Sequence, residues 1–260
     1  MGHLQNKVAI VTGCAKGIGR AIGLAFAEQR AIVVAADVDI NSGAAAAEEF
    51  RHASPRSTFH RIDIANPDAV NDLTNTVVQK FGTIDILVNN AGVTRQIDFF
   101  DLSPAELDWI TSVNVRGTFL MMQAAARFMR KSGSGAIVNI SSIAGKGYKN
   151  TSNIGYAASK GAIIAMTRVA AAQLGKYGIR VNAVCPGLTS TELMEAWLEG
   201  RAAEHGLRKE ELAKSILAES ALQTLNTPAD IAEAVLFLAS DASKNITGQS
   251  INVDSGMLWD

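Results

Sequence analysis

Short apolar segments alternate with longer helical patterns along most of the chain, and this alternation limits the fold more than any other feature. The strand-like segments, rich in Val, Ile and Ala, are residues 7–11, 32–36, 58–62, 84–88, 136–140, 179–184 and 250–253. The helical patterns cover residues 18–29, 42–50, 67–81, 104–129, 155–177 and 229–239. Strands that are apolar on both faces indicate a parallel sheet covered on both sides. We therefore expect a single doubly wound α/β domain over residues 1–260, with helices on both faces of its sheet.

One stretch interrupts this alternation. Residues 193–225 hold no strand pattern, and two amphipathic patterns, over 192–200 and 209–217, fall in or next to it. In a doubly wound architecture this predicts a small helical insertion between a strand and the helix that follows.

Charge and residue usage exclude several classes of function. The chain has 24 Lys and Arg against 25 Asp and Glu, which gives no electrostatic reason to expect nucleic acid or an anionic membrane as a partner. The two cysteines cannot form a disulfide framework, and the four scattered histidines suggest no metal site. The N-terminal residues lack the pattern of a signal peptide, and no apolar run reaches the roughly 18 residues of a membrane span. A cytoplasmic protein is the expectation.

A glycine-rich turn, Thr12 to Gly19, joins the first strand to the first helix. Gly13, Gly17 and Gly19 allow a tight turn, a close approach of backbone N–H groups to a pyrophosphate, and close packing of helix on strand. The N-terminus of the helix, near Lys16 and Ile18, adds partial positive charge. In this strand–turn–helix context the turn predicts a dinucleotide site.

Asp37 ends the second strand, 18 residues after Gly19, and Val38 follows it. A carboxylate at this position accepts both hydroxyls of an adenosine ribose and repels a 2′-phosphate. A helix N-cap is the structural alternative. Lys16 argues for a 2′-phosphate, but direct repulsion from Asp37 should outweigh a flexible surface lysine. The sequence therefore favours NAD over NADP.

Polar and small residues end the next two strands at the same edge of the sheet. Asp63 and Ile64 could hold an adenine through a polar edge and an apolar face. Further along, Asn89 is followed by Asn90, Ala91 and Gly92. The asparagines could contact the cofactor or tie strand ends together, and the small residues favour contact with a ribose.

Tyr156 and Lys160 open a helix and lie four residues apart, so both face the same side. A phenol has a reference pKa of about 10, and a nearby ammonium would bring that pKa toward neutrality. The preceding strand ends in Ser141 and Ser142, which places hydroxyls at the same mouth. This combination predicts an acid–base centre.

These motifs, taken together and in this order, resemble the short-chain dehydrogenase/reductase family, and the match covers nearly the whole chain. The matching positions are Thr12 to Gly19, Asn89 to Gly92, Asn114, Ser142, Tyr156 with Lys160, and Pro186 with Gly187. The resemblance implies a Rossmann-type fold and hydride transfer to or from a nicotinamide cofactor without a metal.

The resemblance also implies a role for each matching residue. Tyr156 would be the acid–base, Lys160 would lower its pKa and bind the nicotinamide ribose, and Ser142 would hold the substrate oxygen. Asn114 would anchor a water that links Lys160 to solvent. A further set would receive the carboxamide and a pyrophosphate oxygen: Pro186, Gly187, Leu188, Thr189 and Thr191.

The region that would contact the substrate departs from the family pattern. Ser142 and Tyr156 are 14 residues apart, one more than in close relatives. In the family the insertion folds over the substrate, so Met194 and Trp197 are expected to belong to a lid.

The resulting hypothesis is an NAD-dependent enzyme that interconverts a secondary alcohol (an alcohol, polyol, sugar or hydroxy acid) and its ketone. The resemblance also implies a homotetramer. An NADP-dependent reductase of 3-oxoacyl thioesters on an acyl carrier protein is the alternative. Its acidic carrier could dock on a small basic patch of Arg127, Arg130 and Lys131. A non-enzymatic NAD sensor is disfavoured, because such descendants usually lose the Tyr or the Lys.

Overall fold

Seven parallel strands form one sheet in the order β3-β2-β1-β4-β5-β6-β7. The computed structural model describes residues 3–259, except for the side chains of Leu193 and His205. Met1, Gly2 and Asp260 lie outside the described residues. The first two belong to the N-terminal segment in which no signal peptide is expected. The strands are β1 Val8–Thr12, β2 Ile32–Asp37, β3 Thr58–Arg61, β4 Ile86–Asn89, β5 Gly135–Ile140, β6 Ile179–Pro186 and β7 Ser250–Val253. This sheet confirms the predicted doubly wound α/β class.

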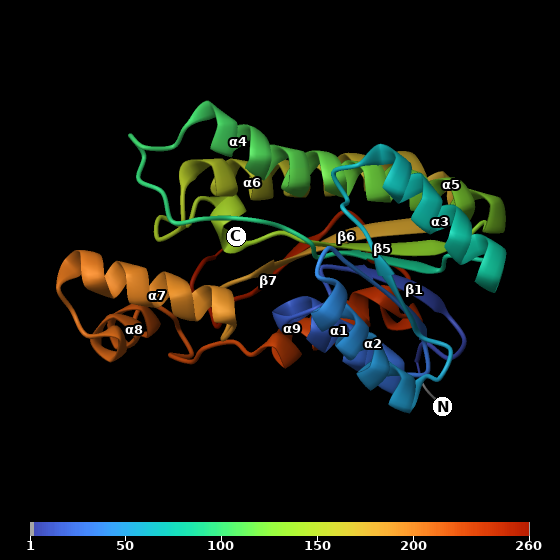
Figure 1. Cartoon of the computed structure of the whole chain (residues 1–260), viewed down its shortest axis with the longest axis horizontal. Helices are drawn as coiled ribbons and strands as arrows, with labels where there is room; N and C mark the ends of the chain where they lie inside the picture. Colours follow the sequence, from blue (N-terminus) through green and yellow to red (C-terminus); the bar gives the residue numbers. More distant parts are fainter. Residues whose placement is uncertain (1–2, 260) are drawn as a thin grey trace.

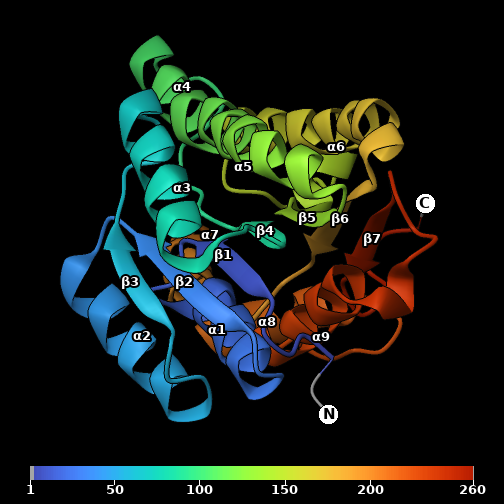
Figure 2. The same cartoon turned by 90° about the vertical axis from the view of Figure 1, so that its right-hand side faces the viewer.

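Helices cover both faces of the sheet (Figures 1 and 2). One layer holds α3 Pro67–Phe81, α4 Pro104–Thr111, α5 Thr118–Ser132 and α6 Ile154–Leu174. The other layer holds α1 Gly17–Glu28, α2 Ile40–Ala53 and α9 Pro228–Ala239. Within β1, Val8 and Ile10 join one buried apolar cluster while Ala9 and Val11 join the other. The inner strands β1, β2, β4, β5 and β6 contribute in the same way to two cores, which explains why those segments are largely apolar.

The predicted helix over 104–129 is not continuous. A π-helix, Ser112–Gly117, separates α4 from α5 and contains the buried Asn114. Gly117 lies so close to Ile64 that a Cβ there would be 2.7 Å from the Ile64 Cδ1 atom. The wider turn places Asn114 against the loop after β4, and π-helical turns of this kind are frequent at functional sites.

The order of the strands reverses beside β1, which pairs with both β2 and β4. In open α/β sheets this reversal creates a crevice at the carboxyl ends of the strands, where ligands bind. The loops after β1, β4, β5 and β6 all open into this region. The fold thus brings together segments that lie more than a hundred residues apart in the sequence.

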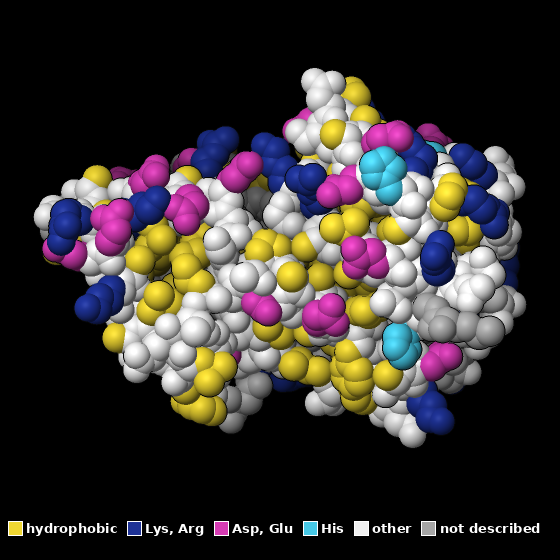
Figure 3. Space-filling model, turned by 90° about the horizontal axis from the view of Figure 1, so that it is seen from below, with side chains coloured by type: hydrophobic (Ala, Val, Ile, Leu, Met, Phe, Trp, Pro, Cys, Tyr) yellow, Lys and Arg dark blue, Asp and Glu magenta, His cyan; other side chains and the backbone are white. Residues whose placement is uncertain are grey.

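The expected insertion forms two helices, α7 Glu192–His205 and α8 Lys209–Leu217, which we call the lid (residues 192–217). The lid projects from the carboxyl end of the sheet (Figure 1). It has an apolar cluster of its own, formed by Met194, Leu198, Ala202, Leu212 and Ile216. Acidic and basic side chains intermingle over this part of the molecule (Figure 3, left). Within the lid, Lys209 pairs with Glu195 and Glu199.

No helix among residues 3–259 has both the length and the apolar character needed to cross a membrane. The same residues contain no group of three or more His, Cys, Asp or Glu side chains arranged to hold a metal ion.

Candidate active site

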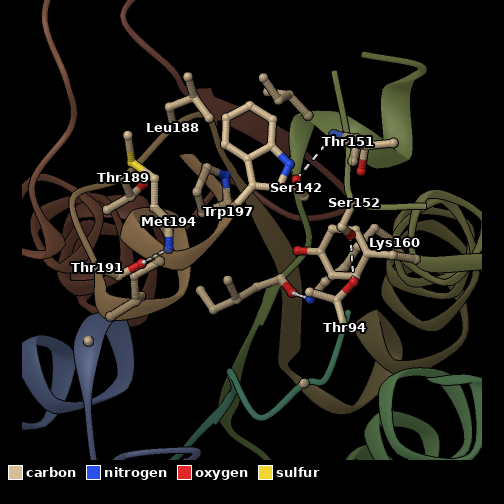
Figure 4. A pocket seen from close by; sticks show the side chains of 18 of the residues that line it. Thr94, Ser142, Thr151, Ser152, Lys160, Leu188, Thr189, Thr191, Met194 and Trp197 are labelled. Carbon is tan, nitrogen blue, oxygen red and sulfur yellow. Dashed lines mark hydrogen bonds between the residues drawn. The ribbon is translucent and has the colours of Figure 1, made fainter. Parts of the chain in front are cut away.

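A cavity of about 870 Å³ lies at the carboxyl ends of the strands, between the sheet and the lid. Figure 4 shows its two walls, with Leu188, Met194 and Trp197 on one side and Thr94, Ser152 and Lys160 on the other. The predicted site residues that line it are Lys16, Gly17, Ile18, Asn90, Gly92, Ser142, Tyr156, Lys160, Pro186, Gly187, Leu188, Thr189, Thr191, Met194 and Trp197. Residues predicted from separate motifs thus share one cavity.

The glycine-rich turn has the close packing that a dinucleotide requires. Gly13 and Gly17 have positive φ angles of 64° and 52°, which favour glycine. A Cβ on Gly19 would lie 2.1 Å from the carbonyl oxygen of Gly13. The first turn of α1 has no side-chain cap and no acidic residue, so its N–H groups remain able to bind a phosphate. These residues fit a pyrophosphate.

Asn90 and Thr12 hold the turn against the end of β4. The Asn90 amide donates hydrogen bonds to the carbonyl oxygens of Thr12 (3.0 Å) and Gly13 (2.8 Å). The Thr12 hydroxyl accepts from the backbone N–H groups of Asn90 and Ala91. Asn89 instead donates to Asn139 on β5 and ties two strand ends together. Both asparagines therefore have structural contacts, and only Asn90 also lines the cavity.

Asp37 is fixed beside the same turn. One carboxylate oxygen accepts a hydrogen bond from the Ala15 N–H (2.9 Å) and the other from the Asp39 N–H (3.0 Å). Lys16 lies on the other side of the turn, where its ammonium is 3.4 Å from the Glu192 carboxylate of the lid. The helix N-cap considered for Asp37 belongs to Asp39, whose side chain caps α2. The Asp37 charge remains available to a ribose.

The predicted adenine contacts, Asp63 and Ile64, do not line the cavity, and neither does Val38, which is predicted to bind the cofactor. Val38 and Asp63 are exposed, and the Asp63 carboxylate accepts from the Ala65 N–H. Ile64 is only 5% exposed and packs in the core against Gly117 of the π-helix, so little of its side chain is available as an apolar face for adenine. A contact between Ile64 and adenine stays a prediction.

Ser142 and Tyr156 meet within the cavity. The Ser142 hydroxyl accepts from the Ala144 N–H (3.1 Å), which orients it at the end of β5. Burial raises the pKa of Tyr156, and a hydrogen bond with Ser142 partly opposes that rise. The spacing from Lys160 predicts a pKa nearer neutrality. The pKa is raised instead, because the phenol loses water on burial, and the contribution that opposes this rise comes from Ser142.

Lys160 is 4% exposed and lies below the Tyr156 ring, with Nζ 5.6 Å from the ring centroid. Its ammonium donates to the Ile140 carbonyl oxygen (2.8 Å). Burial lowers the pKa of Lys160 to about 8. The ammonium faces the ring and a carbonyl, which explains why it does little to lower the pKa of the phenol.

Asn114 is fully buried and close to Lys160. Its side chain accepts from the Val93 N–H (2.8 Å) and donates to the Val93 carbonyl oxygen (3.0 Å) and the Ser159 hydroxyl (3.0 Å). A Cβ on Gly92 would lie 3.3 Å from the Asn114 Oδ1 atom and 3.5 Å from the Lys160 Nζ atom. Only a glycine leaves this space open. The anchoring of a water by Asn114 stays a prediction.

Sequence reasoning missed Asn153. Its side chain caps α6 by accepting from the Tyr156 N–H (2.7 Å), and its amide donates to the Arg95 carbonyl oxygen (2.8 Å). Asn153 therefore fixes the start of the helix that carries Tyr156 and joins it to the loop after β4. The N-cap signal that could have revealed it is an Asn just before the helical pattern that contains Tyr156.

We expect Asn153→Ser to lower kcat about tenfold while changing stability by less than about 0.5 kcal/mol, because serine keeps the cap but does not reach Arg95. Asn153→Ala should lose about 1 kcal/mol more, since the cap is also lost. Steady-state kinetics and urea unfolding measure the two effects. Asn66→Ala is the matched control: Asn66 caps α3 in the same way. Equal losses of activity in Asn153→Ser and Asn66→Ala would refute a positioning role.

The segment after β6 leads directly into the lid. The Leu188 carbonyl oxygen accepts from the Asn226 side chain (3.0 Å), which holds this segment to the chain beyond the lid. The Thr191 hydroxyl caps α7 by accepting from the Met194 N–H. Met194 is 7% exposed and belongs to the cluster inside the lid while it also lines the cavity.

Comparison with known proteins decides the family. The family model described as enoyl-(acyl carrier protein) reductase matches residues 13–258. A solved structure from Burkholderia xenovorans, described as a candidate short-chain dehydrogenase/reductase, shares 36% identity over 100% of both chains with a TM-score of 0.91. The chain belongs to the short-chain dehydrogenase/reductase family. As a short-chain dehydrogenase/reductase it is an NAD(P)-dependent oxidoreductase acting on CH–OH groups and the corresponding carbonyls.

Two curated relatives of this short-chain dehydrogenase/reductase are similar over almost their full length. One is a 3-oxoacyl-[acyl-carrier-protein] reductase of Thermotoga maritima, with 36% identity over 98% of this chain and 99% of the relative. The other is the (2S)-[(R)-hydroxy(phenyl)methyl]succinyl-CoA dehydrogenase subunit of Thauera aromatica, with 39% identity over 97% of each chain.

Proposed function

We propose that this protein interconverts a secondary alcohol and its ketone with NAD as the hydride carrier. The observation that carries the proposal is the meeting of Ser142, Tyr156 and Lys160 in one cavity with the glycine-rich turn. When bound, the nicotinamide ring supplies or accepts the hydride. The chain's own residues position the substrate oxygen and move its proton.

In this proposal the phenol of Tyr156 donates a proton to the substrate oxygen in reduction and removes it in oxidation. Ser142 donates a hydrogen bond to the same oxygen and stabilises its developing charge. Lys160, together with Gly92, Asn90 and Thr191, would hold the nicotinamide end of the cofactor.

Asp37 supports the choice of NAD. Both of its carboxylate oxygens are oriented by backbone N–H groups, so the charge is held at the end of β2. A 2′-phosphate placed there would meet this fixed negative charge. Lys16 is turned to Glu192 on the lid. An exposed lysine of this kind offers little to offset the repulsion.

We expect Asp37→Asn to narrow the preference for NAD over NADP by about ten- to a hundredfold, because it removes the charge but keeps the side-chain volume. Lys16→Gln should leave the NADP efficiency within about twofold. The kcat/KM for each cofactor in wild type and both variants measures this. A wild-type preference for NADP that disappears in Lys16→Gln would show that the lysine decides the cofactor.

The relatives support 3-hydroxyacyl thioesters as a substrate class to test first. The name of one relative describes a 3-oxoacyl reductase, and that of the other a hydroxyl-bearing succinyl-CoA. Docking of a carrier protein on Arg127, Arg130 and Lys131 has less support. That patch lies at the end of α5, just before β5 begins, and so at the opposite edge of the sheet from the cavity. Arg130 stacks on Tyr177 there.

A panel of secondary alcohols, sugars, hydroxy acids and 3-oxoacyl thioesters, each assayed with NAD and NADP by reduced-nicotinamide absorbance, tests the proposal. Turnover of at least one class with NAD is expected. No turnover of any class by wild type would contradict it.

We also propose a homotetramer. Leu107, Phe119 and Val169 leave apolar side chains 38–56% exposed on α4, α5 and α6. Association through this helical layer would cover them. Light scattering on the purified chain measures the oligomeric state.

A further inference from the structure

The charges that line the cavity are unequal. Among the described lining residues, Lys16, Arg95 and Lys160 are cations, and Glu192 is the acid. Lys16 pairs with Glu192, and the buried Lys160 donates to the Ile140 carbonyl oxygen. Arg95 is the remaining cation of this set. It donates no hydrogen bond to a described residue, and its contact with a carboxylate, that of Glu106, is long.

Arg95 is held at the cavity mouth by a ring contact and by one long ion pair. Its guanidinium stacks 4.6 Å from the centroid of the Trp109 ring. The nearest carboxylate is that of Glu106, whose Oε1 atom is 4.0 Å away, at the limit of an ion pair. The Oε2 atom of Glu106 instead accepts from Ser103 in the capping box of α4. No described residue accepts a hydrogen bond from the Arg95 guanidinium, so its donors are free for a ligand.

The backbone under Arg95 is anchored to the catalytic helix. Its carbonyl oxygen accepts from Asn153, the residue that caps α6 beside Tyr156. Thr94 is hydrogen-bonded to Ser152, and the Ile97 N–H donates to the Ser152 carbonyl oxygen (3.2 Å). The guanidinium therefore extends from a fixed point near the phenol, although its side chain is 63% exposed.

We propose that Arg95 binds an anionic group, a carboxylate or a phosphate, that the substrate carries at a distance from its reacting carbon. A guanidinium offers a planar pair of N–H donors that matches either oxyanion. Stacking on Trp109 restricts the side chain before binding, which reduces the entropy cost of the contact. The inference rests on the proposed function, because it assigns a specificity residue to that same cavity. Neutral substrates of equal size would bind more weakly.

Matched substrates test the proposal kinetically. A 3-oxo acid, its neutral N-acetylcysteamine thioester and its coenzyme A thioester place a carboxylate, no charge, or phosphates beyond the reacting carbon. Arg95→Gln should raise KM about tenfold for the anionic substrates, leave kcat within twofold, and leave the neutral thioester unchanged. Arg95→Lys should be intermediate. An effect on the free acid alone assigns a carboxylate, and one on the coenzyme A thioester alone assigns a phosphate. An equal change of KM for all three substrates in Arg95→Gln, or no change for any of them, would overturn the proposal.

A binding measurement separates this inference from the proposed function. Calorimetry on the NAD-loaded protein compares glutarate, a dicarboxylate, with glutaramide, its neutral counterpart. Wild type should bind glutarate at least fivefold more tightly than Arg95→Gln does, and neither protein should prefer glutaramide. Arg127→Gln, an exposed arginine on α5, is the control and should match wild type. Equal glutarate affinity in wild type and Arg95→Gln refutes binding of a carboxylate by Arg95. Together with an unchanged KM for the coenzyme A thioester in Arg95→Gln, it refutes the inference, even if the enzyme turns over every thioester. If wild type binds glutarate more tightly than Arg95→Gln does but turns over no substrate, the inference stands and the proposed function is refuted.

Discussion

Replacing Tyr156 by phenylalanine is expected to lower kcat by about 10²- to 10⁴-fold, the usual contribution of a positioned acid–base group. The substitution removes only the phenol oxygen. The ring keeps its place above Lys160, so the fold and the cavity should be unchanged. Steady-state kinetics with the best substrate of the panel measures the loss, and a thermal melt checks the fold.

Tyr148→Phe is the matched control for this substitution. Tyr148 lines the same cavity, and its hydroxyl accepts a long hydrogen bond from Asn150 (3.4 Å). Its loss should change kcat by less than about threefold, because the contact is weak. If Tyr156→Phe retained activity within the same factor, another group would have to move the proton.

The pH profile should carry the signature of the same phenol. Because burial raises the pKa of Tyr156, the protonated form predominates at neutral pH. Reduction needs this form as a proton donor, so its rate should stay level through neutrality and fall only at alkaline pH. Oxidation needs the phenolate, so its rate should increase with pH across the same range. Tyr148→Phe should keep both trends, and Tyr156→Phe should abolish them.

Lys160→Met is expected to lower kcat about a hundredfold and yet to stabilise the fold at pH 7. The pKa of Lys160 is lowered to about 8 from its ordinary 10.5, so burial of the ammonium costs about 3 kcal/mol. The variant also loses the hydrogen bond to Ile140 and leaves that carbonyl unpaired, which costs roughly 2 kcal/mol. The net gain in the free energy of unfolding should be about 1 kcal/mol.

The pH dependence of this gain follows from the direction of the shift. Between about pH 8 and 10.5 the unfolded chain holds the proton that the folded protein has lost, so wild-type stability increases with pH there. The free-energy cost of burying the ammonium is complete below pH 8 and absent above pH 10.5. The gain in the free energy of unfolding from Lys160→Met should therefore shrink through this window. Urea unfolding at pH 7 and pH 9.5 measures it. Lys244→Met, at an exposed lysine, is the control. A variant less stable than wild type at pH 7 would refute this account.

The sequence was most informative where a short local pattern determines both the backbone structure and what packs against it. Strand segments apolar on both faces predicted the parallel sheet, because the inner strands of the sheet contribute side chains to the apolar clusters on both of its faces. The glycines predicted the turn, because Gly19 has no room for a Cβ. The order of these motifs then placed Ser142, Tyr156 and Lys160 in one cavity.

The sequence was least informative where packing between distant segments decides the result. The π-helix at Asn114 depends on the loop at Val93, and helical periodicity alone gives no sign of it. The pKa of Tyr156 depends on how much water reaches the phenol, which spacing from Lys160 does not reveal. The position of Arg95 depends on Trp109 and Asn153, which belong to two other segments.

The separate apolar cluster of the lid has a consequence for how this enzyme can evolve. Met194, Leu198 and Ile216 pack mainly with one another and with a few neighbours, whereas the strands are stabilised by two other clusters. Substitutions in the lid can therefore accumulate without unfolding the part that binds the cofactor. Under the proposed function, changes in this one short stretch of the gene would alter which substrates are accepted, while Ser142 and Tyr156 would stay under unchanged selection.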